Sequence, residues 1–331
     1  MWTRSVLCVV AACLFSTAAA AGQSAPKPPA NEDCLVCHGE ADAKRADGRT
    51  IALDTKHFEA SIHGPLGCVD CHADAGKEMP HPDKLAKVAC GSCHDDVAGK
   101  YRDSMHSWAK EKAGLIGAPA CADCHGTHDI MPHTAKTSRV YRDRIPETCG
   151  SCHAGVRDKY ETGVHAAALK KGAPSAPVCV DCHQTHAITR TDTDAYRLSV
   201  TAECGTCHAK VVDSFRRTFH GKVTELGFTR VAACADCHGA HDILPKANPA
   251  SMVSTARLVE TCGKCHSGAN ERFVRYDPHP DPSVYSRSAV LWWANRFYWL
   301  LIPGCFGFFG LHSALWFWRA ARERRRKGGA A

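Results

Sequence analysis

The pattern Cys-x-x-Cys-His occurs nine times in this sequence of 331 residues and uses 18 of its 21 cysteines. Two thiols at this spacing, followed directly by an imidazole, are the attachment signature of c-type haem. The thiols form thioethers, and the histidine ligates the iron. Zinc sites and disulfides also use paired cysteines, but neither requires a histidine at this position. The sequence therefore predicts nine covalently bound haem c groups. The sites, numbered 1 to 9 in chain order, are Cys34/Cys37/His38, Cys68/Cys71/His72, Cys90/Cys93/His94, Cys121/Cys124/His125, Cys149/Cys152/His153, Cys179/Cys182/His183, Cys204/Cys207/His208, Cys234/Cys237/His238 and Cys262/Cys265/His266.

The nine motifs belong to an internal repeat. Sites 3, 5, 7 and 9 read Cys-Gly-x-Cys-His, at spacings of 59, 55 and 58 residues. Sites 4, 6 and 8 lie between them and read Cys-x-Asp-Cys-His. Each repeat thus holds two sites, and such repeats stack on their neighbours. The predicted boundaries of four two-site repeats and a closing half-repeat are 34–89, 90–148, 149–203, 204–261 and 262–280.

Histidines outside the motifs follow the same period. One set lies twelve residues after the motif histidine of sites 3, 5 and 7, and another lies three residues after that of sites 4, 6 and 8. The first repeat and the closing half-repeat add three more. Nine haems require nine second axial ligands, and this search finds nine candidates. The predicted distal ligands are His63, His81, His106, His128, His165, His186, His220, His241 and His279.

Other potential ligands do not repeat. His57 and His133 align with other residue types in the sister repeats, so we interpret both as non-ligands. The methionines of the predicted haem region do not recur at a fixed position either. Ligation by two histidines at every iron implies comparatively low reduction potentials.

The first residues are typical of an export signal. Residues 1–21 combine Arg4, an apolar run and a small-residue pattern ending at Ala20, and a Pro-rich linker follows at residues 22–33. The stretch Val10–Cys13 also resembles a lipoprotein box, which leaves lipidation open as an alternative. Because covalent haem attachment takes place outside the cytoplasmic membrane, an export signal is what the motifs require.

A second apolar segment lies near the other end. Residues 297–318 contain no formally charged side chain and are long enough to cross a bilayer. Tryptophans crowd both edges, and the following residues 319–331 are strongly basic. The positive-inside rule then predicts a cytoplasmic tail and a periplasmic haem region, joined to the membrane by a junction at residues 281–296.

Composition bounds the fold and the partners. The formal charge of +7 omits the haem propionates, so the loaded protein is expected to be net negative. No basic patch with interleaved aromatic residues indicates nucleic-acid binding. Residues 34–280 supply too little chain per haem for a separate apolar core. We therefore expect a mainly α fold with long loops, a haem-filled core and one C-terminal transmembrane helix.

These features favour an electron-transfer protein over an enzyme. Saturated irons carry electrons but offer no open position to a substrate, and the cofactor carries the redox chemistry. The expected role is a membrane-anchored relay between quinol, or a b-type membrane cytochrome, and periplasmic redox partners. The alternative is a terminal reductase of a small nitrogen or sulfur oxyanion at one open iron. The membrane segment argues against a third role, an extracellular filament.

The repeats resemble the multihaem cytochrome c family whose modules sit beside, or are fused to, membrane b-type cytochromes. The resemblance extends to the junction, through Tyr276–Pro280, Phe308–His312 and Leu315–Arg319. In such fusions further transmembrane helices carrying haem b follow, whereas this sequence departs from the pattern with a single segment. The resemblance implies quinol oxidation with a separate b-type partner. The implied role is similar to that of the NapC/NirT/NrfH quinol dehydrogenases, which carry fewer haems and an N-terminal anchor.

One ionisable residue falls inside the predicted membrane segment. His312 is a candidate for contact with a quinone or with a haem b shared with a partner, because buried ionisable groups in membranes are usually functional. The alternative is a neutral imidazole hydrogen-bonded to its own helix near the cytoplasmic edge.

Overall fold

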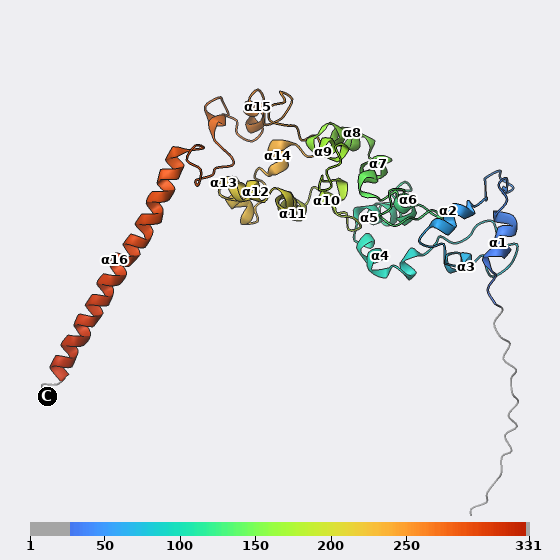
Figure 1. Cartoon of the computed structure of the whole chain (residues 1–331), viewed down its shortest axis with the longest axis horizontal. Helices are drawn as coiled ribbons and strands as arrows, with labels where there is room; N and C mark the ends of the chain where they lie inside the picture. The colour runs from blue at the N-terminus through green and yellow to red at the C-terminus, as the bar shows by residue number, and fades with distance from the viewer. Residues whose placement is uncertain (1–26, 329–331) are drawn as a thin grey trace, which may run out of the picture. The chain divides into compact units, whose positions relative to one another are not determined.

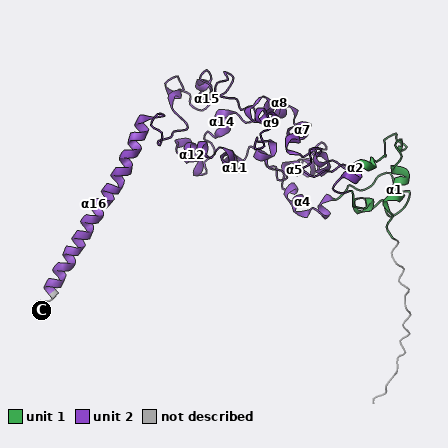
Figure 2. Ribbon diagram, in the orientation of Figure 1, with its two compact units in different colours: residues 1–56, 64–89 green, residues 57–63, 90–331 purple. Residues whose placement is uncertain are grey.

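The structure is a computed structural model and describes residues 27–328 (Figure 1). The predicted signal peptide, the alternative lipidation site and the first residues of the linker lie outside the described residues. The chain divides into two compact units, shown separately in Figure 2. The first holds the described residues up to 56 and residues 64–89, and the second holds residues 57–63 and everything from residue 90 onward.

Short helices and long loops make up both units. Within residues 27–328 there is no β-strand, and a single isolated bridge joins Lys44 to Thr50. The expected mainly α fold is therefore confirmed. The helices are α1 (Asn31–His38), α2 (Thr55–Ala60), α3 (Cys68–Cys71), α4 (Asp95–Arg102), α5 (Met105–Glu111), α6 (Cys121–His125), α7 (Ile145–Gly150), α8 (Ala154–Thr162), α9 (Val164–Lys170), α10 (Cys179–His183), α11 (Asp194–Cys207), α12 (Ala209–Arg216), α13 (Phe219–Glu225), α14 (Cys234–His238), α15 (Leu258–Gly263) and α16 (Ala289–Gly328), with 3₁₀ turns η1 (Cys90–Ser92), η2 (Arg142–Arg144) and η3 (Phe273–Arg275).

The aspartate of the Cys-x-Asp-Cys-His motifs explains why these motifs fold as one-turn helices. At sites 2, 4, 6 and 8 its carboxylate accepts the backbone N–H three residues earlier, at 2.6–2.9 Å. A helix leaves its first N–H groups without partners, and a side-chain acceptor there stabilises the start. The carboxylate thus holds both cysteines and the histidine of the motif on one short helical turn.

A backbone hydrogen bond recurs between repeats, and we call it the ligand clasp. In each clasp the donor is the backbone N–H of the residue just before one predicted distal histidine, which is His63, His106 or His165. The acceptor is the C=O of the residue two positions after another one, which is His128, His186 or His241. The clasps are Ile62 N to Ile130 O at 3.0 Å, Met105 N to Ile188 O at 2.8 Å and Val164 N to Ile243 O at 2.8 Å. Each clasp holds two predicted distal ligands of successive repeats at a fixed separation.

The residue just before each clasp is small or caps the helix that follows. Ser104 is a buried N-cap whose side-chain oxygen accepts from Ser107 N, and the buried Ser61 accepts from the backbone N–H of His63 at 3.2 Å. At the matching position of the third repeat stands Gly163, and a Cβ built there would lie 3.0 Å from the carbonyl oxygen of His241. The close approach of two backbones therefore requires glycine at this clasp.

The protein itself buries little apolar surface. Fully buried apolar side chains among the described residues are few and mostly small. They are Ala118, Ile145, Ala166, Ala176, Val178, Val212 and Phe215. Because hydrophobic burial is the main force that offsets chain entropy, this set is too small to stabilise the fold without a large apolar cofactor.

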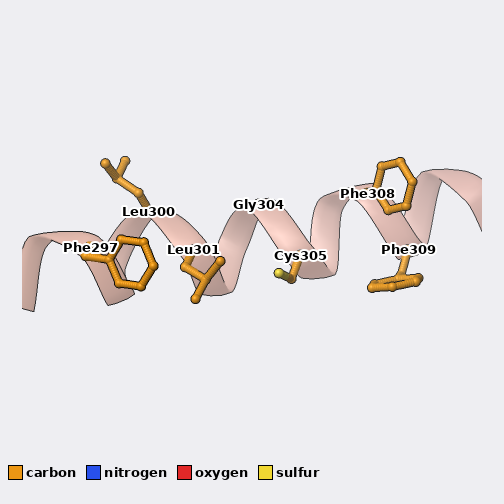
Figure 3. A pocket seen from close by; sticks show the side chains of 7 residues that line it. All are labelled: Phe297, Leu300, Leu301, Gly304, Cys305, Phe308 and Phe309. Atoms are coloured by element: carbon orange, nitrogen blue, oxygen red, sulfur yellow. The ribbon is translucent and has the colours of Figure 1, made fainter. Parts of the chain in front are cut away.

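The last helix is the one apolar helix long enough to cross a membrane among the described residues. Helix α16 has 40 residues, so it begins before the predicted segment at residue 297 and continues through the basic residues to Gly328. Figure 3 shows the side of this helix where Gly304 lies between Leu300 and Phe308 and leaves a shallow apolar hollow. The part of the predicted junction from residue 289 onward is therefore helical.

Replacing Gly163 with Ala tests the clasp. The added methyl would meet His241 O at 3.0 Å and Ile243 N and O at 3.3 Å, so we expect a loss of about 1–3 kcal/mol in the free energy of unfolding. Gly155→Ala is the matched control, since the same methyl inside α8 would meet nothing within 4 Å. Denaturant unfolding of the haem-loaded variants measures both, and equal stabilities would contradict the packing argument.

Candidate haem sites and the pairing of their ligands

Motif histidines and predicted distal histidines lie ring to ring across narrow gaps. A bond from imidazole nitrogen to a metal is about 2.0–2.1 Å and the ring centroid lies about 1.1 Å behind the nitrogen, so two imidazoles on one metal have centroids about 6.2 Å apart. Eight of the motif histidines have a predicted distal histidine at a centroid distance between 5.9 and 6.4 Å. The gaps therefore fit one iron each, held between two imidazoles.

The eight pairs decide which distal candidate faces which site, a question that the sequence left open. One pair lies in the first compact unit and seven lie in the second. In site order the pairs are His38 with His81, His94 with His63, His125 with His186, His153 with His106, His183 with His241, His208 with His165, His238 with His279, and His266 with His220.

The pairing interlocks the repeats. At sites 3, 5, 7 and 9 the second imidazole comes from the preceding repeat, and at sites 4, 6 and 8 it comes from the following one. The two ligands joined by the clasps at Met105 and Val164 thus face neighbouring sites. For example, the clasp at Met105 holds His106 of site 5 beside His186 of site 4.

Two of the predicted ligands remain to be placed. His128 has its ring edge-on to Phe58, with centroids 6.4 Å apart. The ligand roles of His128 and of His72, the motif histidine of site 2, stay predictions.

Burial favours the form of histidine that binds iron. It lowers the pKa of His106, His165 and His220, and the facing motif imidazole lowers each pKa further. The motif histidines His125 and His183 are shifted in the same direction by the same two causes. A neutral imidazole has a free lone pair for a metal, so these environments suit ligation.

The second ring nitrogen of several ligands is also bonded, which fixes how each ring is turned. Nδ1 of His38 lies 2.8 Å from Ile51 O, and Nδ1 of His279 lies 3.1 Å from the hydroxyl of Ser214. Nδ1 of His183 lies 3.3 Å from the hydroxyl of Tyr196. Ser214 was missed from the sequence because the matching residues are Lys100 and Lys159, and Tyr196 because its contact depends on where α11 begins.

Cysteines of neighbouring motifs come together in the same order as the chain. Hydrogen bonds join the thiols of Cys34 and Cys68, of Cys149 and Cys179, and of Cys204 and Cys234. With burial, these contacts raise the pKa of Cys149 and Cys204. Since the thiols are the points of attachment, haems at sites 1 and 2, 5 and 6, and 7 and 8 would lie next to each other.

Weaker contacts continue this order between repeats. Cys124 of site 4 lies near Cys152 of site 5, and Cys182 of site 6 lies near Cys207 of site 7. Cys237 of site 8 lies near Cys262 of site 9, and with burial as the main cause its pKa rises to about 11. Sites 4 to 9 therefore form an unbroken series of neighbours within the second unit.

The second cysteine of every odd-numbered site is exposed, whereas the first is half-buried. The chain packs the first thiol against its neighbours and leaves the second exposed, where a porphyrin would cover it. The exposed second cysteines are Cys37, Cys93, Cys152, Cys207 and Cys265.

The exposure of these thiols does not test the predicted attachment. Cys37, Cys93 and Cys265 are the exposed second cysteines of sites 1, 3 and 9. The sulfur of Cys93 accepts only from the hydroxyl of the adjacent Ser92, at 3.9 Å, among the hydrogen bonds of the described residues. Cys265 lies near the thiol of Cys237 of site 8. Attachment at these three thiols stays a prediction from the motif.

Two arginines have a nitrogen available to an anionic group. The Nε atoms of Arg142 and Arg197 are buried without a hydrogen bond. Arg142 and Arg197 occupy equivalent places, and each forms an ion pair with a motif aspartate, Asp181 at 2.8 Å and Asp236 at 3.1 Å. A guanidinium fixed in this way suits a carboxylate such as a haem propionate.

A site made of protein ligands alone is not assembled. Among residues 27–328 no three or more His, Cys, Asp or Glu side chains come together in a way that could hold a metal. Two facing imidazoles per site match a metal whose other ligands come from a porphyrin. Of the predicted non-ligands, His133 is exposed. His312 is exposed on α16 and lies parallel to Phe308, with centroids 6.5 Å apart.

Comparison with known proteins agrees with this geometry. A Cytochrome c3 family model matches residues 62–154. Over 198 residues the chain is 28% identical to the "Multiheme cytochrome MtrA" of Shewanella baltica (strain OS185), covering 55% of this chain and 54% of that protein. These findings support a multihaem cytochrome c. The second match spans about half the length of the curated relative. No solved structure matches the chain.

Covalent attachment of c-type haem is supported by both similarities. The match to the cytochrome c3 model covers sites 2 to 5, from Cys68 to His153. The five remaining sites carry the same motif. The full count of nine stays a prediction of the sequence.

Removal of a distal histidine tests the pairing at the two sites with atypical ligands. His81→Ala would leave site 1, and His279→Ala site 8, with one imidazole, because the facing rings lie 5.9 and 6.2 Å away. Each variant should convert one haem from low spin to high spin and let it bind carbon monoxide, as measured by EPR and difference absorbance. His133→Ala is the control and should change neither signal. An unchanged His81 or His279 variant would disprove the corresponding pair.

Proposed function

We propose that this protein is a membrane-anchored periplasmic c-type cytochrome with nine haems, which relays electrons between the quinol pool, or a b-type membrane partner, and periplasmic redox partners. The observation that carries the proposal is the set of eight facing imidazole pairs, 5.9 to 6.4 Å between centroids. A bound haem supplies one-electron chemistry at its iron. At these eight sites the paired histidines would hold the iron from both sides and leave no position for a substrate.

The order of the attachment cysteines supports relay along the chain. Thiols of successive sites from site 4 to site 9 are neighbours, and those of sites 1 and 2 are neighbours within the first unit. The protein's part is to hold these sites at short intervals, because its axial ligands neither bind nor transform a small molecule. At the eight sites with facing histidines, the second imidazole disfavours the alternative, a terminal reductase, which needs one open iron.

Helix α16 supports the membrane anchor. It is apolar over a length that exceeds a bilayer core, with Trp292, Trp293 and Trp299 toward one end and Trp316 and Trp318 toward the other. Basic residues after Trp318 favour a cytoplasmic C-terminal end and a periplasmic haem region. Export of the haem region and oxidation of quinol at the membrane are part of the same proposal.

His312 extends the proposal to the membrane partner. Its ring lies against Phe308 on an exposed face of α16, one turn from the apolar hollow beside Gly304. An imidazole at this depth suits contact with a quinone or ligation of a haem b shared with a partner helix. Small residues on the same helix would allow such a helix to approach closely.

A haem count combined with EPR tests the relay directly. The oxidised, detergent-solubilised protein should contain nine haems by pyridine haemochrome and should give low-spin signals only. A high-spin signal equivalent to one haem would overturn the relay in favour of the reductase, and the distal roles of His81 and His279 would be the first to be doubted.

Deletion of residues 290–331 tests the anchor. The truncated protein should keep its haems and its full reduction by dithionite, but quinol-dependent reduction should fall at least tenfold, because the reductant remains in the membrane. Retention of full quinol activity would refute the role of α16 in electron uptake. In the full chain, His312→Ala separates the side chain from the anchor, and an unchanged rate would remove His312 from the mechanism.

A further inference from the structure

One motif histidine in the second unit has a phenol on its second nitrogen. The hydroxyl of Tyr196 lies 3.3 Å from Nδ1 of His183, the motif histidine of site 6. The two rings are nearly parallel, 9° apart, with centroids 5.7 Å from each other. The same imidazole also faces His241, with ring centroids 6.0 Å apart. His183 thus lies against both a predicted distal histidine and a tyrosine.

The polarity of this hydrogen bond follows from ligation. Once Nε2 of His183 binds the iron, Nδ1 carries the ring proton, so the imidazole donates and the phenol oxygen accepts. An acceptor on the second nitrogen fixes the ring orientation and makes the ligand more basic. A more basic ligand stabilises the ferric iron relative to the ferrous iron, which lowers the reduction potential.

The bond arises from a local change in the repeat. Tyr196 stands eight residues before Cys204, and Tyr141 stands eight residues before Cys149 in the preceding repeat. Around Tyr141 the chain forms the short turn η2 and then α7, whereas from Asp194 it forms the single helix α11, which runs to Cys207. Thr193 caps α11 by accepting from the backbone N–H of Tyr196.

The earlier start of this helix is what brings Tyr196 to His183. Neither Tyr141 nor His125, the equivalent pair at site 4, has such a hydrogen bond in the part of the chain that the structure describes. Tyr196 is also close to the attachment thiols of two sites. After burial, Cys182 of site 6 and Cys204 of site 7 are the next causes that raise its pKa. Tyr196 therefore lies where the third repeat joins the fourth, on helix α11, which also carries the cysteines of site 7.

We propose that Tyr196 is a positioning residue that sets site 6 at a lower reduction potential than its repeat equivalent, site 4, by accepting a hydrogen bond from His183. The proposal rests on the two-histidine ligation of the proposed function but not on its quinol partner. A site of lower potential in the middle of the series would be reduced after its neighbours. Electrons in the partly reduced protein would then reside mainly on either side of site 6.

Tyr196→Phe keeps the ring and removes the acceptor. A hydrogen bond contributes about 1 kcal/mol, so the ferrous-to-ferric ratio at one haem should rise about fivefold to tenfold at a fixed ambient potential. A tenfold change corresponds to about 59 mV for a one-electron couple. Redox titration followed by absorbance and EPR on the full chain should show one component in nine shifted upward. Tyr141→Phe is the matched control and should leave all components in place.

A second variant distinguishes the loss of the hydrogen bond from a change in packing. Fluorotyrosine placed at position 196 alone keeps the hydroxyl but weakens its oxygen as an acceptor, so the same component should shift upward by less than in the Phe variant. An unshifted titration in Tyr196→Phe, with haem count and low-spin signals intact, would overturn the proposal. A shift of equal size in Tyr141→Phe would also overturn it. Failure of the relay itself would appear separately, as a high-spin signal in the unmodified protein.

Discussion

The narrow gap between facing imidazoles, 6.0 Å between centroids at site 6, is the constraint on which the fold depends. With so few buried apolar side chains, the described chain has little else to hold its short helices together. One iron held by two histidines from different repeats would tie those repeats at a distance fixed by two metal–nitrogen bonds. Haem loading and folding are therefore one equilibrium, as in small metal-dependent domains that are unfolded without metal.

The protein part of the structure prepares this ligation before any metal–ligand bond is considered. Motif aspartates cap one-turn helices and place two cysteines and a histidine on a single turn. The clasps set the backbone of two distal ligands side by side, and burial keeps imidazoles such as His106 and His165 neutral. Local hydrogen bonding thus reduces the conformational entropy that the chain would lose when an iron brings two histidines together.

The sequence was sufficient for the fold class and for the nine motifs, because covalent attachment demands specific residue types at fixed spacing. It could not assign distal ligands to sites. A histidine twelve residues after one motif faces the next odd-numbered site, 40 or more residues further along the chain, and no local pattern encodes that distance. The His-x-Ile pattern after sites 4, 6 and 8 did mark the clasps in hindsight. No sequence pattern distinguished Tyr196, because Tyr141 occupies the equivalent position. Only the earlier start of helix α11 brings Tyr196 to His183.

Exchange of ligands between neighbours also determines how such a chain changes length. Excising residues 149–203 would leave His106 and His241 to meet His208 and His125, whose surroundings match those of their present partners. Removing only one site of a repeat would instead leave a histidine without a facing partner on each side of the deletion. A whole two-site repeat is therefore the smallest step by which duplication or deletion in a gene can lengthen or shorten this conductor while every iron stays six-coordinate.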